Sequence, residues 1–162
     1  MQSLNEAVRE YTAQLKHGQI QKAYKGIMTF MSGLKTFLES RHPDYAASGL
    51  YFGYMDMTYF AFTPPELKLR SLKIAIVYLH EQNRFELWLG GANRKVQAEA
   101  IEMLRGRDIG GNKLSEVRPG GDSIVEMELT QTPDFDHPED LMLAIESKVI
   151  EFSKSIKFSL GI

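Results

Sequence analysis

Charged and aromatic side chains gather in two stretches whose composition is otherwise typical of β-strands. Asp56 lies in an aromatic run at residues 50–62, and Arg84, Glu86 and Trp88 alternate along a second run. Alternate residues of a strand point to one face, so these three side chains are expected to lie together. A carboxylate in a partly apolar setting is either paired or shifted in pKa, and both occur at functional sites. A structural ion pair between Arg84 and Glu86 is the simpler interpretation.

The tyrosines of the aromatic run extend this candidate site. Tyrosine joins an apolar ring to a hydrogen-bonding hydroxyl, which suits a ligand pocket. The phenylalanines of the run, Phe52, Phe60 and Phe62, are instead predicted to belong to the core. The predicted ligand-binding residues are Tyr54, Asp56, Tyr59, Glu86, Trp88 and Arg94. We expect them to bind a small-molecule ligand or a protein partner through a sheet face; self-association of that face, as a homodimer, is an alternative.

A second alternative is a metal-dependent nuclease or a degenerate relative of one. The order of helix, strands, helix and strand is similar to the PD-(D/E)xK core, where an Asp and a Glu-x-Lys on adjacent strands hold a divalent metal. Asp56 and Glu86 could supply the carboxylates, but Trp88 stands where the lysine is required. Lys73 or Lys95 would have to replace it.

Other motifs give weaker indications. The segment from Gly90 to Lys95 joins two glycines to two bases and could hold an anion at a helix start. It matches neither the P-loop nor the dinucleotide fingerprint, so a plain strand-to-helix turn explains it as well. Acids at residues 134–140 lack the calcium-loop spacing, and the four histidines are scattered. No metal site and no cofactor are predicted, and whether the protein is an enzyme stays open.

Length and composition indicate one globular domain over residues 1–162. The chain has no cysteine, which excludes disulfides and agrees with a reducing cytoplasm. Its formal net charge of −2 disfavours nonspecific binding to nucleic acid. The N-terminal residues show no signal-peptide pattern, and no apolar run reaches membrane-spanning length. We therefore expect a cytoplasmic protein that does not enter the membrane.

Two helices are predicted in the first 41 residues. A capping box begins the first at Ser3, and Gly18 suits its C-terminal end. The second ends near Arg41, because the residue before Pro43 is forced out of helical geometry. Their apolar stripes are Leu4, Val8, Tyr11 and Leu15, followed by Ile20, Tyr24, Ile27, Met31, Leu34 and Leu38.

Two further helices follow later in the chain. Asn93 caps one, and Pro138 stands in the first turn of the other. Their predicted buried residues are Val96, Ala100, Met103 and Leu104, then Leu141, Ile145, Val149, Phe152 and Ile156.

The strands are predicted from β-branched and aromatic residues. A hairpin within residues 50–62, turning at Met55 and Asp56, would pair Phe52 with Tyr59. A second hairpin, with strands at 72–80 and 85–89, would turn at residues 82–83 and place Val77 opposite Trp88. A last strand at 123–130 directs Val125, Met127 and Leu129 inward.

These elements define the fold class as α+β. We expect a mainly antiparallel sheet of about five strands, with two N-terminal helices, one middle helix and a C-terminal helix packed on it.

Several blocks of the sequence resemble a family of small uncharacterised bacterial proteins with a domain of unknown function. They are Leu50-Tyr-Phe-Gly-Tyr-Met-Asp-Met-Thr-Tyr-Phe60, Leu72-Lys-Ile-Ala-Ile-Val77, Arg84-Phe-Glu-x-Trp-Leu89, Asn93 with Gln97, and Pro133-Asp-Phe-Asp136. The similarity covers nearly the whole chain. It implies a one-domain bacterial cytosolic protein and brings no activity or ligand with it.

Overall fold

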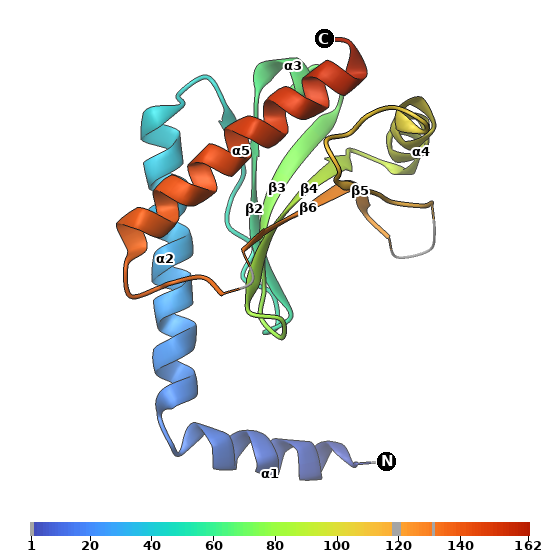
Figure 1. The fold of residues 1–162 in the computed structure, drawn as a ribbon. Coiled ribbons are helices and arrows are strands. Elements are labelled where there is room, and N and C mark those ends of the chain that lie inside the picture. The colour runs from blue at the N-terminus through green and yellow to red at the C-terminus, as the bar shows by residue number, and fades with distance from the viewer. Residues whose placement is uncertain (1, 118–120, 131) are drawn as a thin grey trace.

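The fold is an antiparallel sheet with helices packed against it, as the computed structural model shows for residues 2–117, 121–130 and 132–162 (Figure 1). The helices that it describes are α1 (Leu4–Leu15), α2 (Gln19–Arg41), α3 (Pro65–Lys68), α4 (Arg94–Leu104) and α5 (Pro138–Leu160). The strands are β1 (Ala46–Ala47), β2 (Met57–Thr63), β3 (Leu72–Leu79), β4 (Arg84–Gly91), β5 (Lys113–Leu114) and β6 (Ser123–Thr130). The predicted α+β class is confirmed.

Within those residues the sheet has six strands in the order β1-β2-β3-β4-β6-β5, and every neighbouring pair is antiparallel. Consecutive strands β2, β3 and β4 are neighbours, and the chain passes through α4 before β6 pairs with β4. The two-residue strands β1 and β5 and the single-turn helix α3 lie outside the predicted elements. Such short segments carry too few residues to show a periodic pattern.

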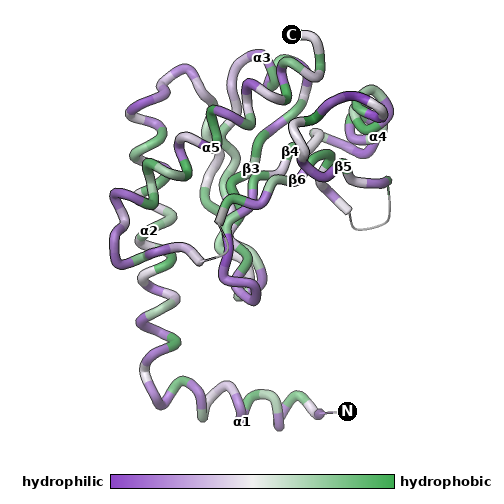
Figure 2. The backbone as a smooth tube through the Cα atoms, in the orientation of Figure 1, coloured by the Kyte–Doolittle hydropathy of each residue, from purple (hydrophilic) through white to green (hydrophobic). Residues whose placement is uncertain are grey.

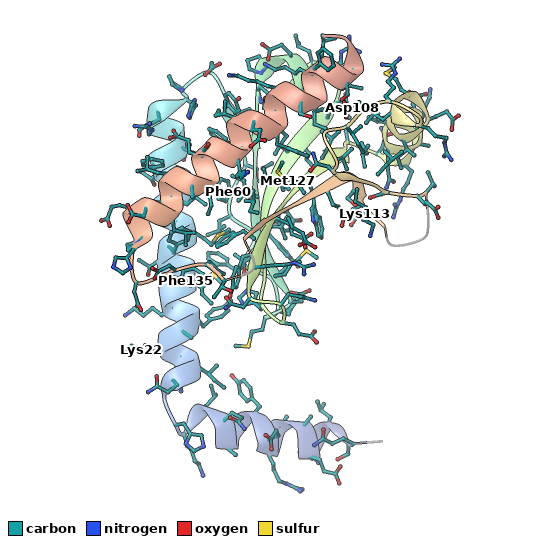
Figure 3. The ribbon with its side chains drawn as sticks, in the orientation of Figure 1. Lys22, Phe60, Asp108, Lys113, Met127 and Phe135 are labelled. Atoms are coloured by element: carbon teal, nitrogen blue, oxygen red, sulfur yellow. The ribbon has the colours of Figure 1, made fainter. Side chains whose placement is uncertain are left out.

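Helices α2 and α5 cover one face of the sheet, which we call the covered face (Figure 1). Alternation along the strands points an apolar set to this side, and the cross-strand row Phe60, Ile76 and Leu87 is completely buried. Phe60 on β2 belongs to the core, and Met127 on β6 packs against it (Figure 3). The predicted apolar stripe of α5, Leu141, Ile145, Val149, Phe152 and Ile156, is buried as expected. Figure 2 shows the corresponding concentration of hydrophobic residues in the strands.

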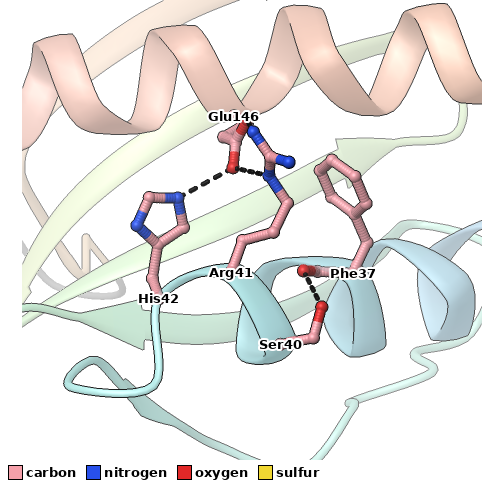
Figure 4. Close-up of polar contacts among 5 residues, drawn as sticks. All are labelled: Phe37, Ser40, Arg41, His42 and Glu146. Atoms are coloured by element: carbon pink, nitrogen blue, oxygen red, sulfur yellow. Dashed lines mark hydrogen bonds and ion pairs between the residues drawn. The ribbon is translucent and has the colours of Figure 1, made fainter.

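A polar cluster of Arg41, His42 and Glu146 joins the two covering helices where α2 ends (Figure 4). The Glu146 carboxylate of α5 accepts hydrogen bonds from Arg41 Nε at 2.6 Å and Nη2 at 3.0 Å, and it contacts His42 Nε2 at 2.8 Å. The hydrogen bonds from Arg41 hold the pKa of Glu146 below its usual value. The side chain of Glu146 is only 11% exposed, so these partners replace the water that its burial removes.

Both predicted hairpins differ from the structure in register. In the second, Val77 lies opposite Glu86 and Ala75 opposite Trp88, because four residues rather than two connect β3 to β4. That shift is two positions, which leaves every side chain on its predicted face, since side chains alternate with period two.

The predicted first hairpin is wrong in a different way. Residues 50–56 form no named strand, and a single bridge pairs Tyr51 with Tyr59. The chain turns at Gly53, which has φ +76° and where a β-carbon would lie 2.0 Å from the Met57 carbonyl oxygen. Only glycine fits there. Phe52, predicted to be core, is consequently 53% exposed, whereas Phe60 and Phe62 are fully buried.

Helix α1 stands apart from the sheet (Figure 1). Its predicted capping box is present, with Ser3 Oγ accepting from Glu6 N and Glu6 accepting from Ser3 N. No residue of this helix is buried, so its apolar stripe does not pack on the sheet as expected. Gly18, expected at its end, adopts a left-handed conformation as the N-cap of α2. Among the described residues, no helix is both long and apolar enough to cross a membrane.

Candidate functional site

The second face of the sheet, which we call the open face, carries side chains that are largely only partly buried. It is formed by the alternate residues Met57, Tyr59, Ala61, Lys73, Ala75, Val77, Glu86, Trp88, Gly90, Glu126 and Glu128. A pocket of about 280 Å³ opens on it, just below the ~300–1,000 Å³ range of ligand sites. The pocket joins the apolar centre of this face to the polar start of α4.

The floor of the pocket is apolar and contains Trp88, the chain's one tryptophan. Its indole Nε1 donates to Glu86 Oε1 at 2.8 Å, and Arg84 Nε donates to Glu86 Oε2 at 2.7 Å. Glu86 is 4% exposed, so its carboxylate is held by these two donors rather than by water. The hydrogen bond to Glu86 also raises the pKa of Arg84. The indole ring of Trp88 is therefore fixed in orientation while it remains partly exposed to the pocket.

Small residues make room for the ring. Ala75 lies directly across from Trp88 and lines the pocket, whereas Ala61, the next alanine in that cross-strand row, does not line it. Tyr59 supplies a second aromatic surface, and its ring packs against that of Tyr51 at 5.0 Å between centroids.

The start of α4 closes one end of the pocket. Asn93 caps this helix, accepting a hydrogen bond from Val96 N at 2.9 Å. Gly91 lets the helix approach the strand, since a β-carbon there would lie 2.9 Å from Gln97 N. The Gln97 side chain is buried and donates to the carbonyls of Gly121 and Ser123. These bonds fix the segment before β6 against α4.

Arg94 and Lys73 bring positive charge to the same end. Arg94 donates to Gln97 Oε1 and to the carbonyl of Gly121, and its Nη2 lies 3.5 Å from Asp122 Oδ1. Lys73 lies across from Gly90, and its aliphatic stem runs beside that glycine.

Three of the six residues predicted as ligand-binding line the pocket: Tyr59, Trp88 and Arg94. Glu86 lies on the same face and orients Trp88, without lining the pocket itself. Tyr54 and Asp56 are placed elsewhere, in the turn before β2, and Tyr54 is 88% exposed. The backbone N–H of Tyr54 donates to Asp56 Oδ1 at 2.9 Å and lowers the pKa of that carboxyl. The role that the structure gives Asp56 is thus to hold the turn.

The spacing of Asp56 and Glu86 does not support the nuclease alternative. Tyr59 on β2 pairs with Val77 on β3, and Val77 pairs with Glu86 on β4. Asp56 is therefore displaced from Glu86 by three residues along the chain and by two strands across the sheet. Each of those offsets is about 10 Å, too far for two carboxylates to share one metal ion. Within the described ranges there is also no group of three or more His, Asp or Glu residues placed to hold a metal.

Several pocket residues were not predicted as ligand-binding. Lys73 carried a signal, because it is the one charged residue in an otherwise apolar strand. The segment from Gly90 to Lys95 also carried one, as a glycine pair followed by bases before a helix. Gln97 and Ser123 had no local signal, since only the approach of α4 to the start of β6 gives them a place in the site.

Comparison with known proteins identifies a family and no characterised relative. Searches of curated proteins and of solved structures find no match to this chain. The sequence profile described as "Domain of unknown function (DUF7000)" matches residues 4–160. That span includes every element from α1 to α5. The chain therefore belongs to the DUF7000 family, a domain family of unknown function.

Proposed function

We propose that this protein binds a small organic molecule in the pocket on the open face of its sheet. The observation that carries the proposal is the partly exposed Trp88 ring, held in one orientation by the buried Glu86 carboxylate. The ligand would come from the bacterial cytoplasm, the source and location that the sequence predicts.

The energetics of Glu86 support a binding role over a purely structural one. A buried ion pair is often no more stabilising than well-packed apolar residues, because its desolvation offsets its attraction. The Arg84–Glu86 pair does something an apolar pair would not do, since it fixes the indole N–H of Trp88. A ring whose rotation is already restricted loses less entropy when a ligand stacks on it.

Trp88 makes the proposal directly testable, because tryptophan emission reports only this site. A panel of small metabolites is titrated into the protein while Trp88 fluorescence and thermal stability are followed. We expect at least one compound to change the emission and to raise the melting temperature, as a ligand of the native state must.

Two alanine substitutions on the same cross-strand row provide the control. Ala75→Leu places a larger side chain in the pocket beside Trp88, whereas Ala61→Leu adds the same volume to the open face outside it. Ala75→Leu should weaken binding at least about tenfold, and Ala61→Leu should leave it unchanged. Absence of any ligand from a broad panel, or equal effects of the two variants, would contradict the proposal.

Self-association is a second candidate function, and helix α1 is the observation that favours it. Its apolar residues Leu4, Val8 and Tyr11 are 80%, 48% and 56% exposed. A hollow of about 960 Å³ runs along α2, where a side chain added at Gly26 would meet no atom within 4 Å. Light scattering should show a dimer that Val8→Glu dissociates. A monomer at high protein concentration would remove this candidate.

A further inference from the structure

We infer that the ligand of the open-face pocket is a small, flat molecule that carries one carboxylate or phosphate group, bound with its anion at Lys73. This inference rests on the proposed function and adds the chemical class of the ligand.

The charges that line the pocket do not balance. Lys73 and Arg94 contribute two positive charges, and Asp122 contributes one negative charge. Asp122 is close to Arg94, at 3.5 Å between Oδ1 and Nη2. Lys73 takes part in no ion pair among the described residues. One unpaired cation in a pocket favours a ligand with an anionic group.

The two cations are suited to different tasks. The guanidinium of Arg94 already donates to Gln97 Oε1 and to the carbonyl of Gly121, which fix its position. Its main contribution to the pocket is therefore a positive electrostatic potential. The ammonium of Lys73 has three donors and is the group that can bond directly to an anion. Arg94 holds positive charge at the same end of the pocket and adds to the attraction for an anion, which salt screens because both cations are exposed.

The stem of Lys73 lies beside Gly90 on the neighbouring strand. A β-carbon placed on Gly90 would lie 3.7 Å from Cε and 3.8 Å from Cγ of Lys73, so the lysine stem runs along the glycine backbone. Lys73 as a whole is exposed, so its ammonium is reached from solvent while its stem runs beside the sheet. That placement puts the charge at the open edge of the pocket, where an anion can reach it.

The rest of the floor indicates the shape of the ligand. Ala75, Val77 and the rings of Tyr59 and Trp88 form an apolar surface beside the cations. Sheet side chains of this kind present a broad, shallow surface, and aromatic rings favour offset stacking with another flat group. A flat ring over Trp88 with its anion toward Lys73 uses both halves of the pocket.

The test compares four aromatic compounds of similar size: benzoate, phenyl phosphate, benzylamine and benzyl alcohol. Binding to the full chain is followed by the NMR signal of the Trp88 indole N–H, the one such signal in the protein. Both anions should bind at least about tenfold more tightly than the neutral and cationic compounds. Added salt should reduce that preference, because it screens exposed charges. Whichever anion binds more tightly identifies the headgroup as carboxylate or phosphate.

Matched lysine variants identify the residue responsible. Lys73→Met removes the charge and keeps the length of the side chain, and it should abolish the preference for anions. Lys95→Met removes a charge from the first turn of α4 outside the pocket, and it should leave the preference intact. An unchanged preference in Lys73→Met would overturn the inference.

The outcomes also separate this inference from the proposed function. If benzyl alcohol binds as tightly as benzoate and Ala75→Leu still blocks it, the pocket binds ligands but the assigned ligand class is wrong. If neither these compounds nor the metabolite panel binds, the proposed function itself fails.

Discussion

The two faces of the sheet use the same alternating strands for opposite purposes. Leu87 and Trp88 are consecutive residues of β4, yet Leu87 is completely buried under the helices and Trp88 is partly exposed in a pocket. Along the covered face, side chains interlock with α2 and α5. Along the open face, alanines and glycines leave space, and the one buried carboxylate orients a ring. The difference shows that stability is concentrated on one side, which leaves the other side free to carry a site.

The largest expected effect tests the covered face. Leu87→Ala removes a fully buried side chain and leaves a cavity, so it should lower the free energy of unfolding by about 2–5 kcal/mol. The matched change on the open face, Met57→Ala, removes a partly exposed side chain and should cost less than half as much. Denaturant titrations of both variants measure the difference. Equal losses would mean that the open face contributes to stability as the core does.

An intermediate effect is expected at the polar cluster between the covering helices. Glu146→Gln replaces the carboxylate that Arg41 and His42 share, and it should cost about 1–2 kcal/mol, since Arg41 is half exposed and can rehydrate. Chemical denaturation at neutral pH measures this loss.

The same polar cluster predicts a pH dependence of the free energy of unfolding. The pKa of Glu146 is lowered in the folded protein from a starting value of 4.5. Its contribution is therefore fully present above about pH 4.5 and is lost as the pH falls through the lower folded-state value. The stability difference between the natural protein and Glu146→Gln should shrink in acid. A difference that stays constant down to the acid transition would rule out this role.

The smallest expected effect concerns the carboxylate on the open face. Glu86→Gln keeps the shape of the side chain but cannot accept from both Arg84 and Trp88, so it should cost about 1 kcal/mol and shift Trp88 emission. Glu128→Gln is the control, because Glu128 is 54% exposed and 3.6 Å from Arg84. It should change stability by less than about 0.5 kcal/mol and leave the emission unchanged. If both variants behave alike, Glu86 does not fix the indole.

Much of the secondary structure follows from local rules. The capping box at Ser3, the Asn93 cap and the stripe of α5 all match the structure, because each depends on residues within a few positions of one another. Met103 was predicted to be buried but is 44% exposed, whereas Ile101, two residues earlier, is buried. The buried face of α4 is therefore rotated about the helix axis from the predicted one. Packing determines this rotation, and the spacing of apolar residues alone does not.

The candidate site was predicted in part for the same reason. Alternation predicted that Arg84, Glu86 and Trp88 share one face, and this stays true when the register shifts by two residues. Tyr54 and Asp56 were assigned to that face through a hairpin that Gly53 replaces with a tight turn. Their positions depended on turn geometry, which the aromatic composition of the segment does not encode.

The sequence by itself determined the four longer helices, the four longer strands and the side of each strand that is apolar, because periodicity is a local property of the chain. Only the tertiary structure decided which amphipathic surfaces are covered. The apolar stripes of α1 and α5 have the same kind of spacing, yet one has no buried residue and the other is packed against the sheet. The pocket likewise required tertiary structure, since Lys73, Trp88 and Arg94 meet only where β3, β4 and α4 come together. Burial requires a second surface to pack against, and the spacing of residues in one segment does not determine which surface that is.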